Sequence, residues 1–189
     1  MKCALIIFSM THQDEPNESQ ANKLCKACGL CCTGHLFIWA KLRPAELDSA
    51  EALGMHVYRD DPTQRGFSQP CPLWKGACTI YTSPHYPHSC RAYTCNLFDD
   101  VVRETTSLPD ALARIEQAKG LIQDLEPHLP ITSAINFRER LVARLEGLEA
   151  STERDELEFR LKAEALLLFY EKVFGVKDLL EKPDERPRP

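Results

Sequence analysis

Apolar positions in the second half of the chain recur every three or four residues, which is the period of an α-helix. The first stripe lies between Ser107 and Pro127 and consists of Leu108, Leu112, Ile115, Ala118, Ile122 and Leu125. Ser107 and Asp110 resemble a capping box at its start, and Pro127 closes the pattern. This spacing predicts an amphipathic helix between Ser107 and Pro127.

Two more helices are predicted by stripes of the same kind. The second stripe consists of Phe137, Leu141, Leu145 and Leu148. The third is opened by Thr152 with Asp155, is ended by Gly175, and carries Leu157, Leu161, Ala165, Leu168 and Phe169. We expect the three stripes to pack against one another or against the first half of the chain.

The first half has a different pattern, with short apolar runs separated by cysteines and prolines. The run at 35–42 suits a strand, and a short helix is expected from Pro44 to a stop at Gly54. Residues 60–70 read as a loop. The predicted fold class is mixed α+β, mostly α: an irregular cysteine-rich metal module with few short strands plus a C-terminal helical segment.

These changes of pattern divide the chain into four parts. Residues 1–22 are expected to be a flexible N-terminal segment, and residues 23–98 a cysteine-cluster metal-binding module. Residues 99–182 are the expected helical segment packed on that module. Residues 183–189 are charged and rich in proline, and we expect a disordered tail.

Composition and charge narrow the possible functions. Hydrophobic residues make up 43% and charged residues 27% of 189 positions, as in ordinary soluble globular proteins. The net charge of -5 provides no basic field for nucleic acid. The apolar run at 3–8 is too short for a signal sequence, and no run approaches the roughly 20 residues of a membrane span. We therefore expect a cytoplasmic protein without nucleic-acid or membrane partners.

Eight of the nine cysteines form a spaced constellation. They are Cys25, Cys28, Cys31, Cys32, Cys71, Cys78, Cys90 and Cys95. The C-x2-C spacing lets two thiolates from one tight turn bind one ion, and Gly29 suits a position with positive φ. A turn at Lys75 and Gly76 would bring Cys71 and Cys78 together, while Cys90 and Cys95 could lie about one helical turn apart.

Metal ligation explains this spacing better than the alternatives. Structural disulfides need an oxidising compartment, for which the chain shows no targeting signal. Cysteines that merely fill a core would not recur as C-x2-C-x2-CC, and a thioredoxin-like redox pair needs a βαβ setting that does not follow here. His35, His85 and His88 flank the cysteines and are expected to be hydrogen-bond donors or loop residues rather than ligands.

The spacing leaves the metal open. A tetrahedral zinc takes four thiolates, so eight cysteines could hold two zinc ions or one with thiols to spare. Cys25, Cys28 and Cys31 also reproduce the first three ligands of a [4Fe-4S] run, with Cys71 before Pro72 as a distant fourth. Zinc and iron, the number of metals and the choice between Cys31 and Cys32 all stay open.

The cysteine segments resemble a known family. The runs "CKACGLCC", "CPLWKGACTIY" and "YPHSCRAYTC" are similar to the YkgJ-type, or CxxCxxCC, family of zinc- or iron-chelating proteins, over residues 24–98. The family's Arg-Pro ahead of the last segment is replaced here by Tyr86-Pro87, whereas Arg91 is kept. The resemblance implies that the metal ligands are Cys25, Cys28, Cys31, Cys32, Cys71, Cys78, Cys90 and Cys95.

Three functional hypotheses follow. The first is a cysteine-cluster protein in which zinc or an iron-sulfur centre holds the module together. The second is an iron-sulfur enzyme or electron carrier, because a bacterial flagellin lysine methylase has a related cysteine domain with such a centre. The third is a metal-delivery protein, for which the pair Cys31-Cys32 would give a spare sulfur. The C-terminal helices could bind a protein partner.

Overall fold

The computed structural model describes residues 18–131, 136–148 and 153–177. It is a mixed α+β fold that is mostly helical, as the sequence predicted. The expected tail at 183–189 and most of the expected flexible segment at 1–22 lie outside the described residues, and the first helix begins at Gln20. No helix within the described ranges has both the length and the apolar character needed to cross a membrane.

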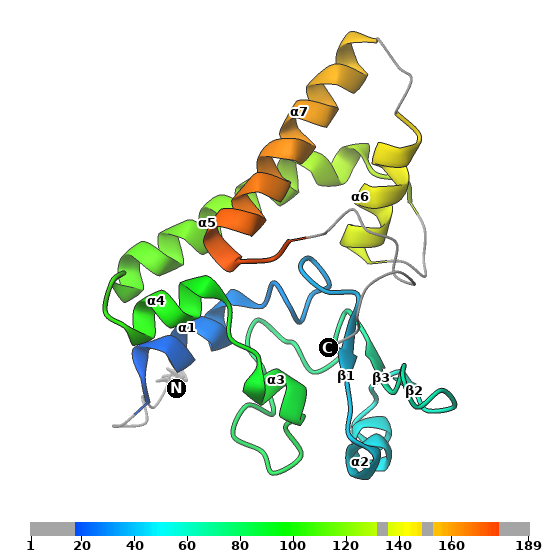
Figure 1. The fold of residues 1–189 in the computed structure, drawn as a ribbon, viewed down its shortest axis with the longest axis vertical. Helices are drawn as coiled ribbons and strands as arrows, with labels where there is room; N and C mark the ends of the chain where they lie inside the picture. Colours follow the sequence, from blue (N-terminus) through cyan, green and yellow to red (C-terminus); the bar gives the residue numbers. More distant parts are fainter. Residues whose placement is uncertain (1–17, 132–135, 149–152, 178–189) are drawn as a thin grey trace, which may run out of the picture.

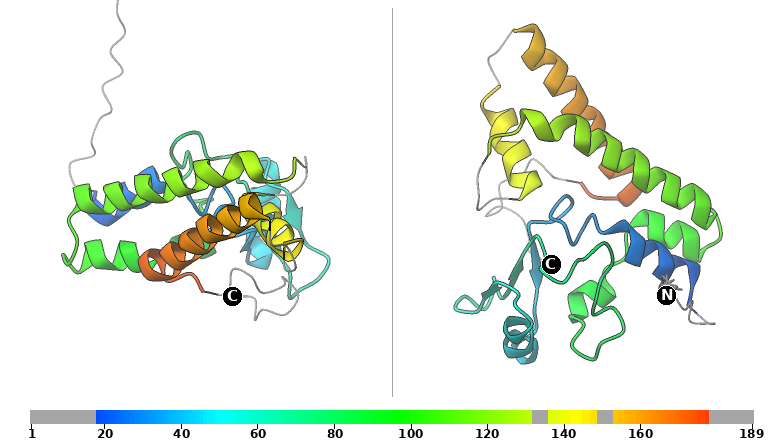
Figure 2. Two further views of the ribbon diagram at one scale, coloured as in Figure 1. Left: turned by 90° about the horizontal axis from the view of Figure 1, so that it is seen from above. Right: turned by 180° about the vertical axis from the view of Figure 1, so that it is seen from behind.

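The helical part of the fold is built on α5, Leu108–Leu125. Helix α7, Arg154–Phe169, lies along α5, and α6, Phe137–Glu146, packs near their far end (Figure 1). Two shorter helices, α1 (Gln20–Cys28) and α4 (Asn96–Val102), lie against the other end of α5. Figure 2 shows from above that α7 runs obliquely beside α5.

The predicted stripe of the first long helix is confirmed. Ala111, Ile115, Ala118, Ile122 and Leu125 are buried, and Leu108 and Leu112 are partly buried against them. The Ser107 hydroxyl accepts a hydrogen bond from the backbone N–H of Asp110 at 3.3 Å. A short 3₁₀ turn, η2 at Glu126–His128, then contains Pro127. The second stripe is also confirmed, because Phe137, Leu141 and Leu148 are buried in the same core.

The predicted buried face of the third helix is wrong. Leu157, Leu161 and Leu168 are 44%, 67% and 50% exposed, and the buried face of α7 consists of Phe159, Ala163 and Leu166. Helix α7 carries apolar residues on more than one side, so their spacing is compatible with either of two buried faces. The contact of α7 with α5 decides which of these faces is buried. Thr152 lies outside the described residues.

The helical segment that begins with α7 ends at Gly175, as expected. A π-helical turn, η3 at Tyr170–Phe174, follows α7, and Gly175 closes it with a φ of 71°. A Cβ at Gly175 would lie 2.6 Å from Oδ1 of Asn96, so the end of the helical segment packs closely on the start of α4.

The sheet is small and antiparallel. Its order is β1-β3-β2, formed by Trp39–Lys41, Gly66–Ser68 and Val57–Tyr58. Strand β1 confirms the strand expected within 35–42, with Ala40 opposite Phe67. The prediction of a loop at 60–70 is wrong in part, because β3 is the central strand. Its three residues have no recognisable alternation of their own, so pairing on both sides decides their conformation.

A short helical segment and α3 complete the sheet side of the molecule. The 3₁₀ turn η1, Pro44–Glu46, leads into α2, Leu47–Ala52, and Gly54 follows with a φ of 86°. This agrees with the helix expected between Pro44 and Gly54. Helix α3, His88–Ala92, contacts β1.

The described residues form two hydrophobic cores of unequal size. The main core contains side chains from α1, α4, α5, α6, α7 and η3. The small core consists of Leu42, Leu47, Ala50, Met55 and Phe67, next to the sheet. The buried Arg138 of α6 donates a hydrogen bond to the Leu36 carbonyl at 3.1 Å, which ties the helical part to the loop after the first cysteines.

Candidate metal centre

The first two cysteines lie at the end of a helix rather than in a free turn. Cys25 and Cys28 are three residues apart in α1, so both lie on one face. Gly29 ends the helix with a φ of 71°, which confirms the positive φ predicted there. A Cβ at Gly29 would clash with the ring of Trp74, so the segment that carries Cys71 and Cys78 packs directly on this turn.

Cys31 and Cys32 lie in the turn that follows. The N–H and hydroxyl of Thr33 both donate to the Gly29 carbonyl, at 2.8 and 2.9 Å. Cys31 packs against the main core. The carbonyl of Cys32 accepts a hydrogen bond from the N–H of Cys71 at 2.7 Å, which links Cys32 to the second cysteine segment. The two adjacent residues therefore contact different parts of the molecule.

Cys71 and Cys78 are joined by the predicted turn. Trp74 and Cys78 form an antiparallel bridge, and the Lys75 N–H donates to the Ala77 carbonyl at 3.0 Å. Gly76 has a φ of 82° at the tip. The turn is confirmed, although it carries a single bridge rather than two strands.

Cys90 and Cys95 are placed apart. Cys90 lies in α3, whereas Cys95 is the N-terminal capping position of α4, and the extended backbone at Tyr93 separates the two helices. Cys90 packs against the small core and Cys95 against the main core. The expectation of one shared helical turn is therefore wrong.

The surroundings and electrostatic interactions of the thiols define two sets. We call Cys25, Cys28, Cys31 and Cys95 the core-side thiols, and Cys32, Cys71, Cys78 and Cys90 the sheet-side thiols. Members of a set lie near enough for their charges to interact. Cys31 interacts most with Cys28, whereas Cys32 interacts most with Cys78, Cys90 and Cys71. The two sets also interact with each other, because Cys31 is affected next by Cys32, and Cys25 interacts with Cys78, Cys32 and Cys90.

The core-side thiols are strongly biased toward the neutral form. Burial raises the pKa of Cys28 to about 12 and that of Cys31 well above its usual value, and repulsion from neighbouring thiolates adds to both. Burial also raises the pKa of Cys95. The Cys25 side chain reaches the surface, yet the protein around its sulfur raises its pKa to about 11, with further repulsion from Cys95 and Cys78.

The sheet-side thiols show the same trend. Burial raises the pKa of Cys90 to about 12, with repulsion from Cys71 as the next cause. The pKa values of Cys32, Cys71 and Cys78 are also raised, each mainly by burial. Lys26 partly offsets the shift at Cys78. Both sets therefore hold neutral thiols at neutral pH when no cation is near.

All eight described cysteines are free thiols, and no disulfide joins any two of them. Within the described residues, no three Cys, His, Asp or Glu side chains are grouped closely enough to hold a metal ion as they stand. The eight thiols thus match soft metals in chemistry and number, but their sulfurs would have to draw together and lose protons on binding. The predicted ligand set remains a prediction.

Several tyrosines near the thiols were not anticipated. The Tyr81 hydroxyl donates to Oδ1 of Asn22 at 3.0 Å. Tyr81 is also near enough to Cys25 to lower the pKa of that thiol slightly, against the larger effect of burial. The Lys26 ammonium lies 5.6 Å from the centre of the Tyr81 ring, and the Arg91 guanidinium lies 5.2 Å from that of Tyr86. Tyrosines are common in protein cores, so the sequence alone could not mark Tyr81 and Tyr86 as part of the site. Their position beside the thiols is seen only in the structure.

The three flanking histidines differ in their surroundings. His35 is hydrogen-bonded to the Thr33 hydroxyl at 2.6 Å and lies 5.0 Å from Phe137, ring centre to ring centre. Burial lowers its pKa to about 4. His85 is exposed, and the backbone N–H of His88 donates to Glu46 at 2.8 Å.

Comparison with known proteins assigns no relative: no family model, curated protein or solved structure matches this chain significantly. These comparisons leave the resemblance in the cysteine segments untested, and function has to be argued from the thiols themselves.

Proposed function

We propose that the protein binds zinc or iron, the latter including an iron-sulfur centre, through two sets of four cysteine thiolates in the cytoplasm. The observation that carries this proposal is the division at Cys31-Cys32. Cys28, Cys31 and Cys95 pack against the main core, whereas Cys71 and Cys90 pack against the small core. The strongest interaction of Cys31 is with Cys28, and those of Cys32 are with Cys78, Cys90 and Cys71, which gives two groups of four. Four thiolates are what a structural zinc ion or a [4Fe-4S] cluster requires.

The chemistry of the donors supports the same proposal. Burial keeps the free thiols neutral, and four of them close together would repel one another if all lost their protons. A cation removes this conflict, because it stabilises every thiolate that binds it. Disulfides would resolve the repulsion differently, but the eight described cysteines are all free.

A structural role fits the sheet side. Its core has five buried residues, and the segments that carry Cys71 and Cys78 contain turns and one isolated bridge. A region with so little buried apolar surface gains much of its stability from a bound metal. The likeness of these segments to chelating proteins of the CxxCxxCC kind agrees with this role.

A redox role is the second candidate, and it applies to the core side. Cys28, Cys31 and Cys95 pack against the main hydrophobic core. Burial and few surrounding charges are features that tune the potential of an iron-sulfur centre. A delivery role is less favoured, because Cys31 and Cys32 each have their own partners and neither is spare. A protein partner would bind the C-terminal helices.

The proposal is tested by measuring zinc, iron and acid-labile sulfide in the full-length protein, purified without oxygen. We expect two four-thiolate centres per chain. A brown sample with broad visible absorption identifies iron-sulfur, and a colourless sample that contains zinc identifies zinc. A protein that contains neither metal and whose stability is unchanged by a strong chelator would overturn the proposal.

Single serine variants test the division into sets. Cys95→Ser should lose the core-side metal, and Cys90→Ser the sheet-side metal, each leaving the other centre in place. Cys3→Ser is the matched control, because Cys3 belongs to neither set, and it should retain the full metal content. Equal loss of all metal in both Cys95→Ser and Cys90→Ser would contradict two separate centres.

A further inference from the structure

The core-side thiols share their buried surroundings with one polar atom that has no partner. Tyr170 is 1% exposed, and its hydroxyl oxygen makes no hydrogen bond to any described residue. A buried hydroxyl without a partner is unfavourable, and phenylalanine would fill nearly the same space without this penalty. The hydroxyl therefore calls for an acceptor that the protein alone does not provide.

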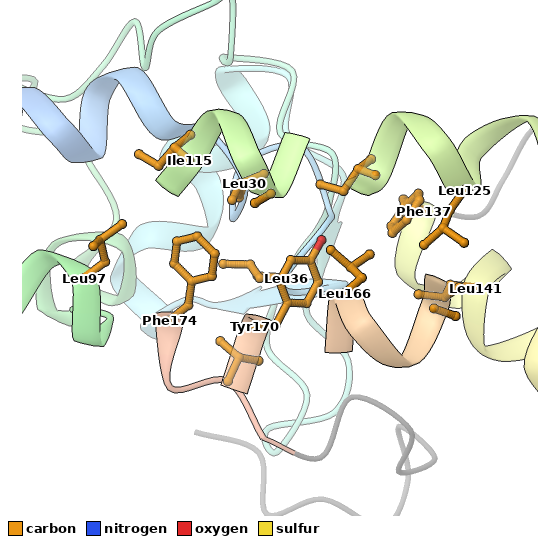
Figure 3. Close-up of a cluster of buried hydrophobic side chains, with 14 of the residues drawn as sticks. Leu30, Leu36, Leu97, Ile115, Leu125, Phe137, Leu141, Leu166, Tyr170 and Phe174 are labelled. Carbon is orange, nitrogen blue, oxygen red and sulfur yellow. The ribbon is translucent and has the colours of Figure 1, made fainter. Parts of the chain in front are cut away.

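The fold directs this hydroxyl into the core rather than toward solvent. Tyr170 is the first residue of the π-helical turn after α7, and such turns recur at functional sites. Figure 3 shows its ring rising from the end of α7 into the cluster of buried side chains, with the oxygen at the far end. Its ring centre lies 6.1 Å from that of Phe174. The other buried residues of this cluster are aliphatic or aromatic, and Cys28, Cys31 and Cys95 are packed against them.

The charged groups that affect Tyr170 are core-side cysteines. Cys28 and Cys31 pack against the same hydrophobic core that contains Tyr170. Burial raises the pKa of the Tyr170 hydroxyl, and these two cysteines are the next causes. The same turn is fixed beside a third core-side thiol, because Gly175 packs on Asn96, the residue after Cys95. The hydroxyl, which is neutral at physiological pH, is thus a donor beside sulfurs that become acceptors when they bind a cation.

We infer that the Tyr170 hydroxyl donates a hydrogen bond to a sulfur of the core-side centre, at Cys28 or Cys31, when metal is bound. This inference rests on the proposed function. The hydrogen bond satisfies the buried donor and reduces the charge on the thiolate. Tyr170 is in this sense a positioning residue for the centre, since it contacts the ligand and not the metal.

The test is Tyr170→Phe in the full-length protein as isolated, with Tyr58→Phe on β2 as the control at an exposed tyrosine. The release of metal to excess chelator is followed over time, and each of the two centres should give one kinetic phase. The phase that is absent in Cys95→Ser is assigned to the core-side centre. We expect Tyr170→Phe to accelerate this phase about 10-fold or more, as loss of a ligand's hydrogen-bond partner commonly does. The sheet-side phase should be unchanged in both tyrosine variants.

A second readout separates hydrogen bonding from packing. Without metal, Tyr170→Phe should melt at the same temperature as the wild type or higher, because it removes an unpaired buried hydroxyl. With metal it should melt lower. Phe174→Leu, a packing control in the same turn, should lower both melting temperatures. If the metal-free chain does not melt cooperatively, the rate of metal loss decides alone.

The outcomes distinguish this inference from the proposed function. If Cys95→Ser loses metal but Tyr170→Phe releases it at the wild-type rate, the inference on Tyr170 is wrong and the metal centre stands. If Tyr170→Phe lowers both melting temperatures equally, Tyr170 has a packing role only. If neither the wild type nor Cys95→Ser contains zinc or iron, the proposed function fails and the inference fails with it.

Discussion

The core-side and sheet-side thiols differ in the protein that surrounds them. Cys28, Cys31 and Cys95 pack against the main core, to which five α-helices contribute. Cys71 and Cys90 pack against the small core, which has five buried residues and lies beside the three-stranded sheet. The helical side buries many more apolar residues than the sheet side, so we expect its stability to depend less on a bound metal. A metal bound by the sheet-side thiols should therefore mainly stabilise the fold. A metal bound by the core-side thiols should instead be available for redox chemistry.

Removal of the proposed metal tests this contrast most strongly. Chelation should lower the free energy of unfolding by several kcal/mol, toward the roughly 10 kcal/mol that structural zinc can contribute. The loss should fall on residues 39–90, since they have the small core, while α5 and α7 remain helical. Hydrogen exchange before and after chelation is the measurement. Equal loss of protection in α5 and in the sheet would contradict the contrast.

The helical side can be weakened without involving any thiol. Leu166→Ala should cost about 2–5 kcal/mol, because Leu166 is fully buried between α7 and its neighbours. Leu161→Ala on the exposed face of α7 is the matched control and should change stability by less than about 0.5 kcal/mol. Denaturant unfolding of both variants gives these values. A larger loss of stability in Leu161→Ala than in Leu166→Ala would show that the face predicted from the sequence is the buried one.

The contact between the two sides is tested at Gly29. Gly29→Ala should destabilise the protein by about 2–4 kcal/mol, because a Cβ there meets the Trp74 ring and the positive φ disfavours side chains. Gly76→Ala has a similar φ but open space, so it should cost only about 1 kcal/mol. Both values come from denaturant unfolding. Similar costs for the two variants would show that Trp74 does not constrain the turn.

A smaller effect is expected from pH at His35. Its pKa is about 4 in the folded protein and near 6.5 when unfolded, so the unfolded chain binds the extra proton between these values. Stability is fully present above pH 6.5 and falls as pH is lowered toward 4. We expect a loss of about 1–2 kcal/mol between pH 7 and pH 5. In His35→Gln the loss of stability between pH 7 and pH 5 should be smaller. An unchanged dependence of stability on pH would show that other groups cause this loss.

Local sequence signals predicted much of the fold. The stripes of α5 and α6, the caps at Ser107 and Gly175, the strand near Trp39 and the turn at Gly76 all depend on residues close together in the chain. Strand β3 could not be predicted in this way, because it is defined by partners on both sides. The buried face of α7 likewise depends on where α5 lies.

The candidate site divides in the same manner. The chain's eight spaced thiols, their suitability for soft metals and the positive φ at Gly29 follow from the sequence, because spacing and residue type fix local geometry and donor chemistry. The separation of Cys31 from Cys32 and of Cys90 from Cys95, and the packing of Tyr170 and Cys28 in one core, follow only from the tertiary structure. These relations join segments far apart in the chain, and the packing of two unequal cores brings them together.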